Sequence, residues 1–581
     1  MAPLLTKSSI TSDPGCRKSR VDWAGCAREG KAGREMGLLD SMSLEEKIGQ
    51  MVMVGFEGPE LTPSDEEFIG RYEIGNVIFL GRNIVDLAQA ESLTHRLQEI
   101  ASHRRHRVGF LLSIDQEGGV VARLTKGATV LPGNMALGAI GSEEWASRAS
   151  EVTADEMMAL GFNMNLAPVL DINNNPDNPG IGVRSFGEDV SLVTRLGVAS
   201  IEACQSLGVV ATAKHFPGKG DVTVDSHLDL PTVAHSRERL ENFEFAPFDA
   251  AIRAGVGAVM TAHVFFPAVE PEPDLPATLS RNVLTGLLRE ELGFEGVLIT
   301  DDLFMGAIVK RYSIGEAAVR ALVAGADIAL LCHGRAEQAA AIEAILDAAR
   351  VGKISRERVD ESVGRILRLK DRFGLLDPGR YLARHSLERV GSAENRHVAL
   401  EIARGSVTLL ANRRGIIPVA PGGYPDLAVI SPDIRGLTQV EDGQLTDSPL
   451  AAALRQFAPG ARDFAFSQSP EVGEIRDAVD LARSADLVVV GTYNAHIYNE
   501  QGALVRALLD TDVPVVVVTM RNPYDIVQFA AAETCIAAYG FRECTMRAVA
   551  ELIFGAIEPR GRLPVSIPGI CPCGTGLTFQ G

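Results

Sequence analysis

The sequence has no long apolar run and no long basic run, and both absences limit what the protein can be. No stretch of about 18 consecutive apolar residues occurs, so we expect no segment to span a membrane. Basic residues gather only in short pieces such as 103–106, and 56 Lys and Arg stand against 75 Asp and Glu. A formal charge of −19 repels phosphates, which argues against a nucleic acid or an anionic membrane as a partner.

Cysteines are few and scattered, and their spacing excludes common patterns. The chain has 8 of them, without a Cys-x-x-Cys pair, and Cys571 and Cys573 have no His or Cys nearby that could complete a metal site. We therefore expect reduced thiols rather than disulfides. The first residues also lack the apolar core of a secretory signal, so the predicted location is the cytoplasm.

The length of the chain predicts two sizeable domains with short additional segments. Residues 1–38 are polar and without periodicity, so we expect a disordered extension there. Ser43, followed three residues later by Glu46, has the pattern of a capping box at the start of a helix. The predicted divisions after the extension are a first domain over 39–375, a linker over 376–405, a second domain over 406–569 and a loose tail over 570–581.

Short apolar runs alternate with helical patterns throughout the first domain. Continuous apolar runs are typical of parallel strands that are buried on both faces. Eight of them predict a (β/α)8 TIM-like barrel rather than an open sheet. The runs lie near 51–56, 75–80, 108–115, 162–170, 208–214, 257–264, 296–301 and 325–332.

A second series of the same kind follows the linker and predicts a smaller, doubly wound α/β sandwich domain. Five or six parallel strands with intervening helices are expected there. The apolar runs that mark five of them lie at 406–410, 427–431, 485–491, 514–519 and 534–540.

Ionisable residues stand where almost every predicted barrel strand ends, which is where the active site of such a barrel is built. So many charges beside a core are costly unless they are paired or used. One or two could belong to a structural network, but such a network explains the whole set poorly. The residues at these ends are Asp115 with Arg123, Asp171, Lys214 with His215, His263, and Asp301 with Asp302.

Each of these residues also has a plainer explanation when taken alone. Lys214 and His215 could be a buried pair that fastens loops, and a single Asp at a strand end is often a helix cap. A loop histidine such as His227 is usually only solvated. A metal site is not favoured, because His215, His227 and His263 lie on separate segments without the usual ligand spacing.

Together, several motifs resemble glycoside hydrolase family 3 over roughly residues 39–569. The resemblance implies a barrel followed by an α/β sandwich domain, and a glycosidase that needs no cofactor. A loop with Asp225, Ser226 and His227 is similar to that of the family's bacterial β-N-acetylglucosaminidases. The motifs are DQEGG (115–119), IGVRSFGED (181–189), KHFPGKGD (214–221), DSH (225–227), ITDDLFMGAI (299–308) and GRLPVSIPG (561–569).

The resemblance also implies a role for each site residue. Asp301 is then the nucleophile, and His227, paired with Asp225, is the general acid/base. The terminal sugar is held by Asp115, Arg123, Arg184, Lys214 and His215. One departure is Lys219, which stands where family members often have a second histidine in this motif.

The implied reaction is hydrolysis of terminal β-linked N-acetylglucosamine from muropeptide or chitin fragments, as in peptidoglycan recycling. A retaining glycosidase needs a carboxylate near the anomeric carbon and an acid on the leaving oxygen. The alternatives are a phosphorylase that uses the same site, a sugar-binding protein without catalysis, and a metal-dependent barrel hydrolase. The expected partner is a small oligosaccharide or glycopeptide, and the sequence does not indicate an oligomeric state.

Overall fold

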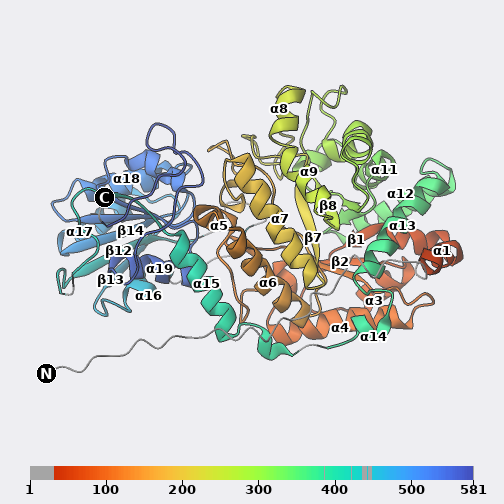
Figure 1. Cartoon of the computed structure of the whole chain (residues 1–581), viewed down its shortest axis with the longest axis horizontal. Coiled ribbons are helices and arrows are strands. Elements are labelled where there is room, and N and C mark those ends of the chain that lie inside the picture. The colour runs from red at the N-terminus through yellow and green to blue at the C-terminus, as the bar shows by residue number, and fades with distance from the viewer. Residues whose placement is uncertain (1–31, 385, 421, 435–440, 442–447, 580–581) are drawn as a thin grey trace.

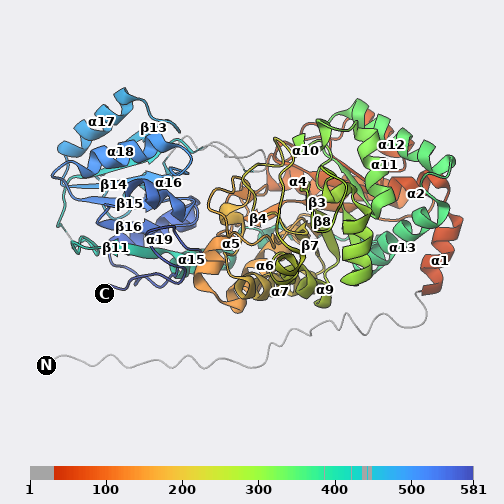
Figure 2. The same ribbon diagram turned by 90° about the horizontal axis from the view of Figure 1, so that it is seen from above.

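The computed structural model describes residues 32–384, 386–420, 422–434, 441 and 448–579. Of the extension predicted over 1–38, residues 1–31 therefore lie outside the described residues. Two bodies lie side by side along the long axis, a large one in red to green and a small one in blue (Figures 1 and 2). Within the described residues, no helix is long and apolar enough to cross a membrane.

The large body is a closed barrel of eight parallel strands, as predicted. Its sheet runs in the order β10-β1-β2-β3-β6-β7-β8-β9, and a bridge between Ile299 and Ile328 joins the last strand to the segment before the first. All residues of these strands are buried, because helices cover the outside and side chains fill the inside. The strands are β1 (Val52–Val54), β2 (Asn76–Phe79), β3 (Leu111–Ile114), β6 (Met164–Asn165), β7 (Val210–Phe216), β8 (Ala258–Thr261), β9 (Val297–Ile299) and β10 (Ala329–Leu331).

Helices surround the barrel, and a short antiparallel hairpin follows β3. The predicted capping box is present, since Ser43 accepts from the amide of Glu46 and Glu46 accepts from the amide of Ser43. The hairpin consists of β4 (Gln116–Gly118) and β5 (Val121–Ala122). The helices are α1 (Ala32–Ser41), α2 (Leu44–Gln50), α3 (Pro63–Arg71), η1 (Gly81–Asn83), α4 (Leu87–His103), α5 (Asn134–Ile140), α6 (Glu143–Ala159), η2 (Gly182–Arg184), α7 (Val190–Ser206), α8 (Arg237–Asn242), α9 (Ala246–Arg253), η3 (Ala277–Leu279), η4 (Asn282–Glu291), α10 (Gly306–Val309), α11 (Ile314–Ala324), α12 (Arg335–Arg350) and α13 (Arg356–Arg372).

The small body is a six-stranded sheet with helices on its faces, in the order β11-β16-β15-β14-β12-β13. Two details differ from the prediction: β11 is antiparallel to β16, and β13 is an edge strand that no apolar run marked. The strands are β11 (Thr408–Asn412), β12 (Leu427–Pro432), β13 (Arg462–Phe466), β14 (Leu487–Thr492), β15 (Val515–Thr519) and β16 (Thr534–Ala537). The helices are α16 (Pro449–Leu454), α17 (Val472–Arg483), α18 (Asn499–Leu509), η6 (Pro523–Phe529) and α19 (Glu543–Ile553).

Two expected divisions, the extension and the tail, differ from the structure, and the segment expected as a linker contains helices. Helix α1 already begins at Ala32, so residues 32–38 are not a disordered extension. The linker contains α14 (Pro378–Tyr381), η5 (Leu387–Arg389) and the long helix α15 (Ala393–Ser406), which connects the two bodies. The tail is not loose over its described part, because Leu577 packs on the second domain and its amide donates to the carbonyl of Leu409 at 2.8 Å.

Candidate active site

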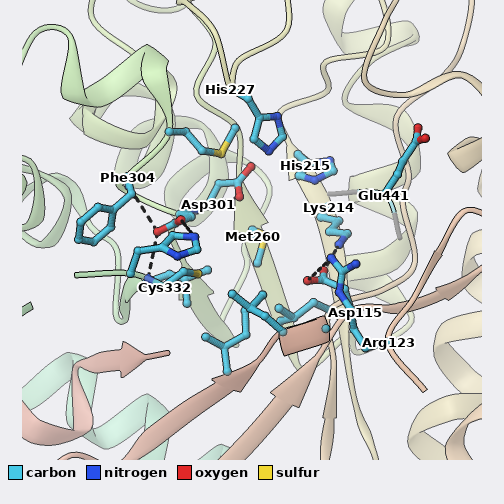
Figure 3. A pocket seen from close by; sticks show the side chains of 18 of the residues that line it. Asp115, Arg123, Lys214, His215, His227, Met260, Asp301, Phe304, Cys332 and Glu441 are labelled. Carbon is cyan, nitrogen blue, oxygen red and sulfur yellow. Dashed lines mark hydrogen bonds and ion pairs between the residues drawn. The ribbon is translucent and has the colours of Figure 1, made fainter. Parts of the chain in front are cut away.

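The loops that follow the barrel strands surround one cavity of about 600 Å³ (Figure 3). Its floor consists of inward-facing strand residues, among them Ile78, Met260 and Leu330. Seven of the eight residues predicted for the site line this cavity, and they are Asp115, Arg123, Arg184, Lys214, His215, His227 and Asp301. The eighth, Asp225, contacts it through His227.

One side of the cavity is a compact cluster of alternating charges. Lys214, near the end of β7, places Nζ 2.7 Å from Asp115 Oδ1 and 2.7 Å from Glu117 Oε1. Arg184 donates two hydrogen bonds to the carboxylate of Glu117, from Nε at 2.9 Å and from Nη2 at 2.7 Å. Arg123 Nη2 lies 3.8 Å from Asp115 Oδ2. Such fixed, buried donors and acceptors suit the hydroxyl groups of a sugar.

Glu117 was not predicted as a site residue, although it is the centre of the cluster. Burial disfavours its charge, but Arg184 and Lys214 outweigh burial and hold the pKa of Glu117 at about 2. It lies on the β4–β5 hairpin inside the motif 115–119. An acidic residue between Asp115 and two glycines was the available signal in the sequence.

The opposite side carries the predicted dyad. His227 Nδ1 lies 2.7 Å from Asp225 Oδ1, which also accepts the backbone amide of His227. Burial opposes ionisation of Asp225, but contact with His227 outweighs it and lowers the pKa of Asp225. Because Nδ1 is held by this carboxylate, Nε2 is the ring nitrogen left for the cavity.

The start of α10 fixes the loop that carries this histidine. The amide of Gly306 donates to the carbonyl of His227, and the amide of Ala307 donates to the carbonyl of Ser226, both at 3.1 Å. Arg311 also holds Asp229, two residues beyond His227, at 2.8 Å. The loop is thus fastened to the segment that directly follows Asp301 and Asp302.

Asp301 and Asp302 follow β9 and have different surroundings. Asp301 Oδ2 lies 3.5 Å from Lys219 Nζ, and the pKa of Asp301 is about 2, because Lys219, His263 and His227 outweigh burial. Asp302 Oδ1 accepts the amides of Cys332 and Phe304, and burial with the charge of Asp301 raises the pKa of Asp302 to about 6. Asp301 is therefore the carboxylate that stays anionic in the cavity.

Two further strand-end residues support the site rather than act in it. Asp171 is fully buried and accepts His215 Nδ1 at 2.7 Å, so it orients a ring that lines the cavity. His263 is bound by Thr278 Oγ1 and by the carbonyl of Asp302, and burial lowers its pKa to about 4. A neutral, fully buried imidazole of this kind positions the loop after β9.

The second domain also contributes to the cavity wall through Glu441 (Figure 3). Its carboxylate is bound by Arg521, with both side chains 1% exposed, and lies 3.4 Å from the hydroxyl of Tyr493. Glu441 was not predicted as a site residue, because only the packing of the two domains brings it to the cavity.

An anionic carboxylate, an oriented imidazole and a cluster of fixed, buried charges in one cavity are the groups that a glycosidase requires. In the described part of the chain, no group of three or more His, Cys, Asp or Glu is placed to hold a metal ion.

Comparison with known proteins identifies the family. Residues 43–369 match the glycosyl hydrolase family 3 N-terminal domain, and residues 407–570 match the family 3 C-terminal domain. The chain therefore belongs to glycosyl hydrolase family 3 and is a glycoside hydrolase acting on O-glycosyl bonds.

Relatives cover both domains of the chain. A protein of Pseudoalteromonas piscicida named β-hexosaminidase A is 31% identical over 87% of this chain and 91% of its own length. A β-N-acetylglucosaminidase/β-glucosidase of Cellulomonas fimi is 30% identical over 92% and 95%. Among solved structures, a family 3 β-N-acetylglucosaminidase from Paenibacillus sp. str. FPU-7 is 43% identical, with a TM-score of 0.86 over 91% of this chain and 99% of that one.

Proposed function

We propose that this protein is a retaining, exo-acting β-N-acetylglucosaminidase that removes terminal β-linked N-acetylglucosamine from muropeptide or chitin fragments. The observation that carries the proposal is the placement of Asp301 and the Asp225–His227 pair in one cavity. The names of the similar proteins support the choice of sugar. The closed floor of the cavity supports an exo mode, because it accommodates the end of a glycan rather than its middle.

In the first step, Asp301 attacks the anomeric carbon. The bond from that carbon to the aglycone oxygen breaks, and His227 gives its Nε2 proton to the leaving oxygen. Because Asp301 is anionic, it stabilises the positive charge that develops on the sugar ring. Asp225 stabilises the imidazolium before the proton leaves and keeps the ring in orientation.

In the second step, the neutral His227 takes a proton from water, and the oxygen attacks the anomeric carbon. The ester bond to Asp301 breaks, and the carboxylate returns to its anionic form beside Lys219. Asp115, Arg123, Arg184, Lys214 and His215 hold the terminal sugar through its hydroxyl groups in both steps.

The described cysteines, Cys204, Cys332, Cys535, Cys544, Cys571 and Cys573, are all free thiols, which supports the cytoplasm as the place of action. Specificity is tested by comparing kcat/KM for aryl β-N-acetylglucosaminide and aryl β-glucoside. The proposal expects a clear preference for the 2-acetamido sugar. Equal values for the two substrates would refute the assignment of the sugar but not the family.

A further inference from the structure

The loop that carries the acid/base dyad is irregular and lightly packed at its tip. Residues 222–234 belong to none of the helices and strands, and they run from the segment after β7 to the start of α8. Val224 and Leu228, on either side of the dyad, are 40% and 64% exposed, so packing alone does not fix this part of the loop. A general acid must lie within hydrogen-bond reach of the leaving oxygen, so the position of His227 depends on how the loop is fastened.

Asp221 stands at the start of this loop and is held by the segment that follows β6. Its Oδ2 accepts from Asn174 Nδ2 at 3.0 Å, and its Oδ1 accepts from Asn175 Nδ2 at 3.1 Å. Asn178 Nδ2 donates at 2.8 Å to the backbone carbonyl of Lys219, two residues before Asp221. The start of the loop is therefore a fixed point on the barrel.

His235 stands at the end of the same loop and binds the same carboxylate. Its Nε2 lies 2.8 Å from Asp221 Oδ2. Burial opposes ionisation of Asp221, but contacts with His235 and with the two asparagines outweigh burial and lower the pKa of Asp221. Because an ionised carboxylate only accepts, Nε2 is the donor in this contact. The contact closes the loop at its base.

We infer that His235, acting through Asp221, is a positioning residue for the acid/base His227. The amides of Gly306 and Ala307 hold the loop near its tip, and the contact of His235 with Asp221 joins its two ends. His235 does not line the active-site cavity, so its effect on the reaction passes through the loop. When the base of the loop is open, His227 loses its alignment with the leaving oxygen. This inference rests on the proposed role of His227 as acid/base.

The test compares kcat/KM for a nitrophenyl β-N-acetylglucosaminide and for the β-1,4-linked disaccharide of N-acetylglucosamine. His235→Ala should lower the disaccharide value about tenfold or more and change the nitrophenyl value by about twofold at most, because only the alkoxide leaving group needs a well-placed acid. Inhibition by free N-acetylglucosamine should keep its wild-type constant, since the charged cluster that holds the terminal sugar is untouched. General damage to the fold would instead change all three quantities together.

Three further variants separate positioning from a loss of stability. His235→Gln places an amide nitrogen close to the position of the imidazole Nε2 and should recover most of the disaccharide activity. His397→Ala removes an exposed histidine on α15 and should behave like the wild type. The double variant Asp221→Ala/His235→Ala should be no slower on the disaccharide than Asp221→Ala alone, because both substitutions break the same contact. Circular dichroism checks that each variant folds.

Equal losses on the two substrates in His235→Ala would overturn the inference, and so would a His235→Gln variant as impaired as His235→Ala. Additive losses in the double variant would show that His235 does not act through Asp221, which also overturns it. If His227→Ala depended on the leaving group and His235→Ala did not, the inference would fail while the proposed function stood. If neither variant showed this dependence, the acid/base assignment of His227 would fail as well.

Discussion

Lys219 Nζ lies 3.5 Å from Oδ2 of Asp301, so the carboxylate assigned as nucleophile has a buried cation beside it. Burial by itself would raise the pKa of Asp301, and this ammonium, with His263 and His227, lowers it to about 2. The position is one where this chain departs from the motif that it otherwise resembles. The ionisation of Asp301 therefore depends on Lys219, whose charge a substitution can remove.

Replacing Lys219 by Met should raise the pKa of Asp301 and move the acidic limb of kcat/KM to higher pH. The sign follows because a nucleophilic carboxylate acts only when ionised, and loss of a nearby cation favours its protonated form. Lys219→Arg, which keeps the charge, is the matched control and should leave the limb close to its wild-type position. An acidic limb that does not move in Lys219→Met would show that Lys219 has no electrostatic role at Asp301.

Gly306→Ala should lower kcat without unfolding the protein. A Cβ at this position would lie 2.5 Å from the carbonyl oxygen of His227 and 2.7 Å from that of Leu228, so the acid/base loop must move. A displacement of about 1 Å near the chemistry can cost about 10²-fold in rate. Gly286→Ala is the control, since nothing lies within 4 Å of its Cβ. Equal kcat values for the two variants would argue against a fixed loop.

His227→Ala should affect substrates according to their leaving groups. A nitrophenolate leaves with little help, so this variant should still form the glycosyl-enzyme and then turn over slowly, giving a burst. A natural disaccharide needs protonation and should lose about 10²–10⁴-fold in kcat/KM. Asp225→Ala should act in the same direction but less strongly.

Glu441→Gln is the companion variant, because Glu441 is a carboxylate that reaches the cavity from the second domain. Its carboxylate is bound by Arg521, so we expect no dependence on the leaving group. The assignment would be wrong if Glu441→Gln slowed the disaccharide far more than the nitrophenyl substrate while His227→Ala slowed both equally. Glu441, and not His227, would then be the general acid/base.

Water should be the acceptor in the second step. Product analysis with and without inorganic phosphate is expected to give free N-acetylglucosamine in both cases. A structure described as a β-glucoside phosphorylase, 25% identical with a TM-score of 0.80, shares the fold, so this control is needed. Accumulation of the sugar 1-phosphate would assign a phosphorylase to the same site.

The barrel was predictable because its strands are buried on both faces and read as continuous apolar runs. The edge strand β13 was missed, since it alternates between exposed and less exposed residues, including Arg462 and Asp463. The antiparallel direction of β11 could not be predicted from the sequence either, because it depends on pairing with β16, which lies far along the chain.

The site was predictable as a set of strand-end residues but not as a network. Sequence showed Lys214 and Arg184 separately, whereas Glu117 acquires its importance only through its contact with both of them. Glu441 was missed for a related reason, since its position depends on how the two domains pack. Residues that act through long-range contact leave little local signal.

The most direct test of the central claim is trapping of the glycosyl-enzyme with a mechanism-based fluorosugar, followed by mass spectrometry of the labelled peptide. The proposed function predicts one covalent label on Asp301, no label in Asp301→Ala, and normal labelling in Asp302→Asn. Asp302 is held by the amides of Cys332 and Phe304, which leaves Asp301 as the carboxylate free to attack. A label on Asp302, or inhibition without any covalent adduct, would contradict the assignment of Asp301 as nucleophile.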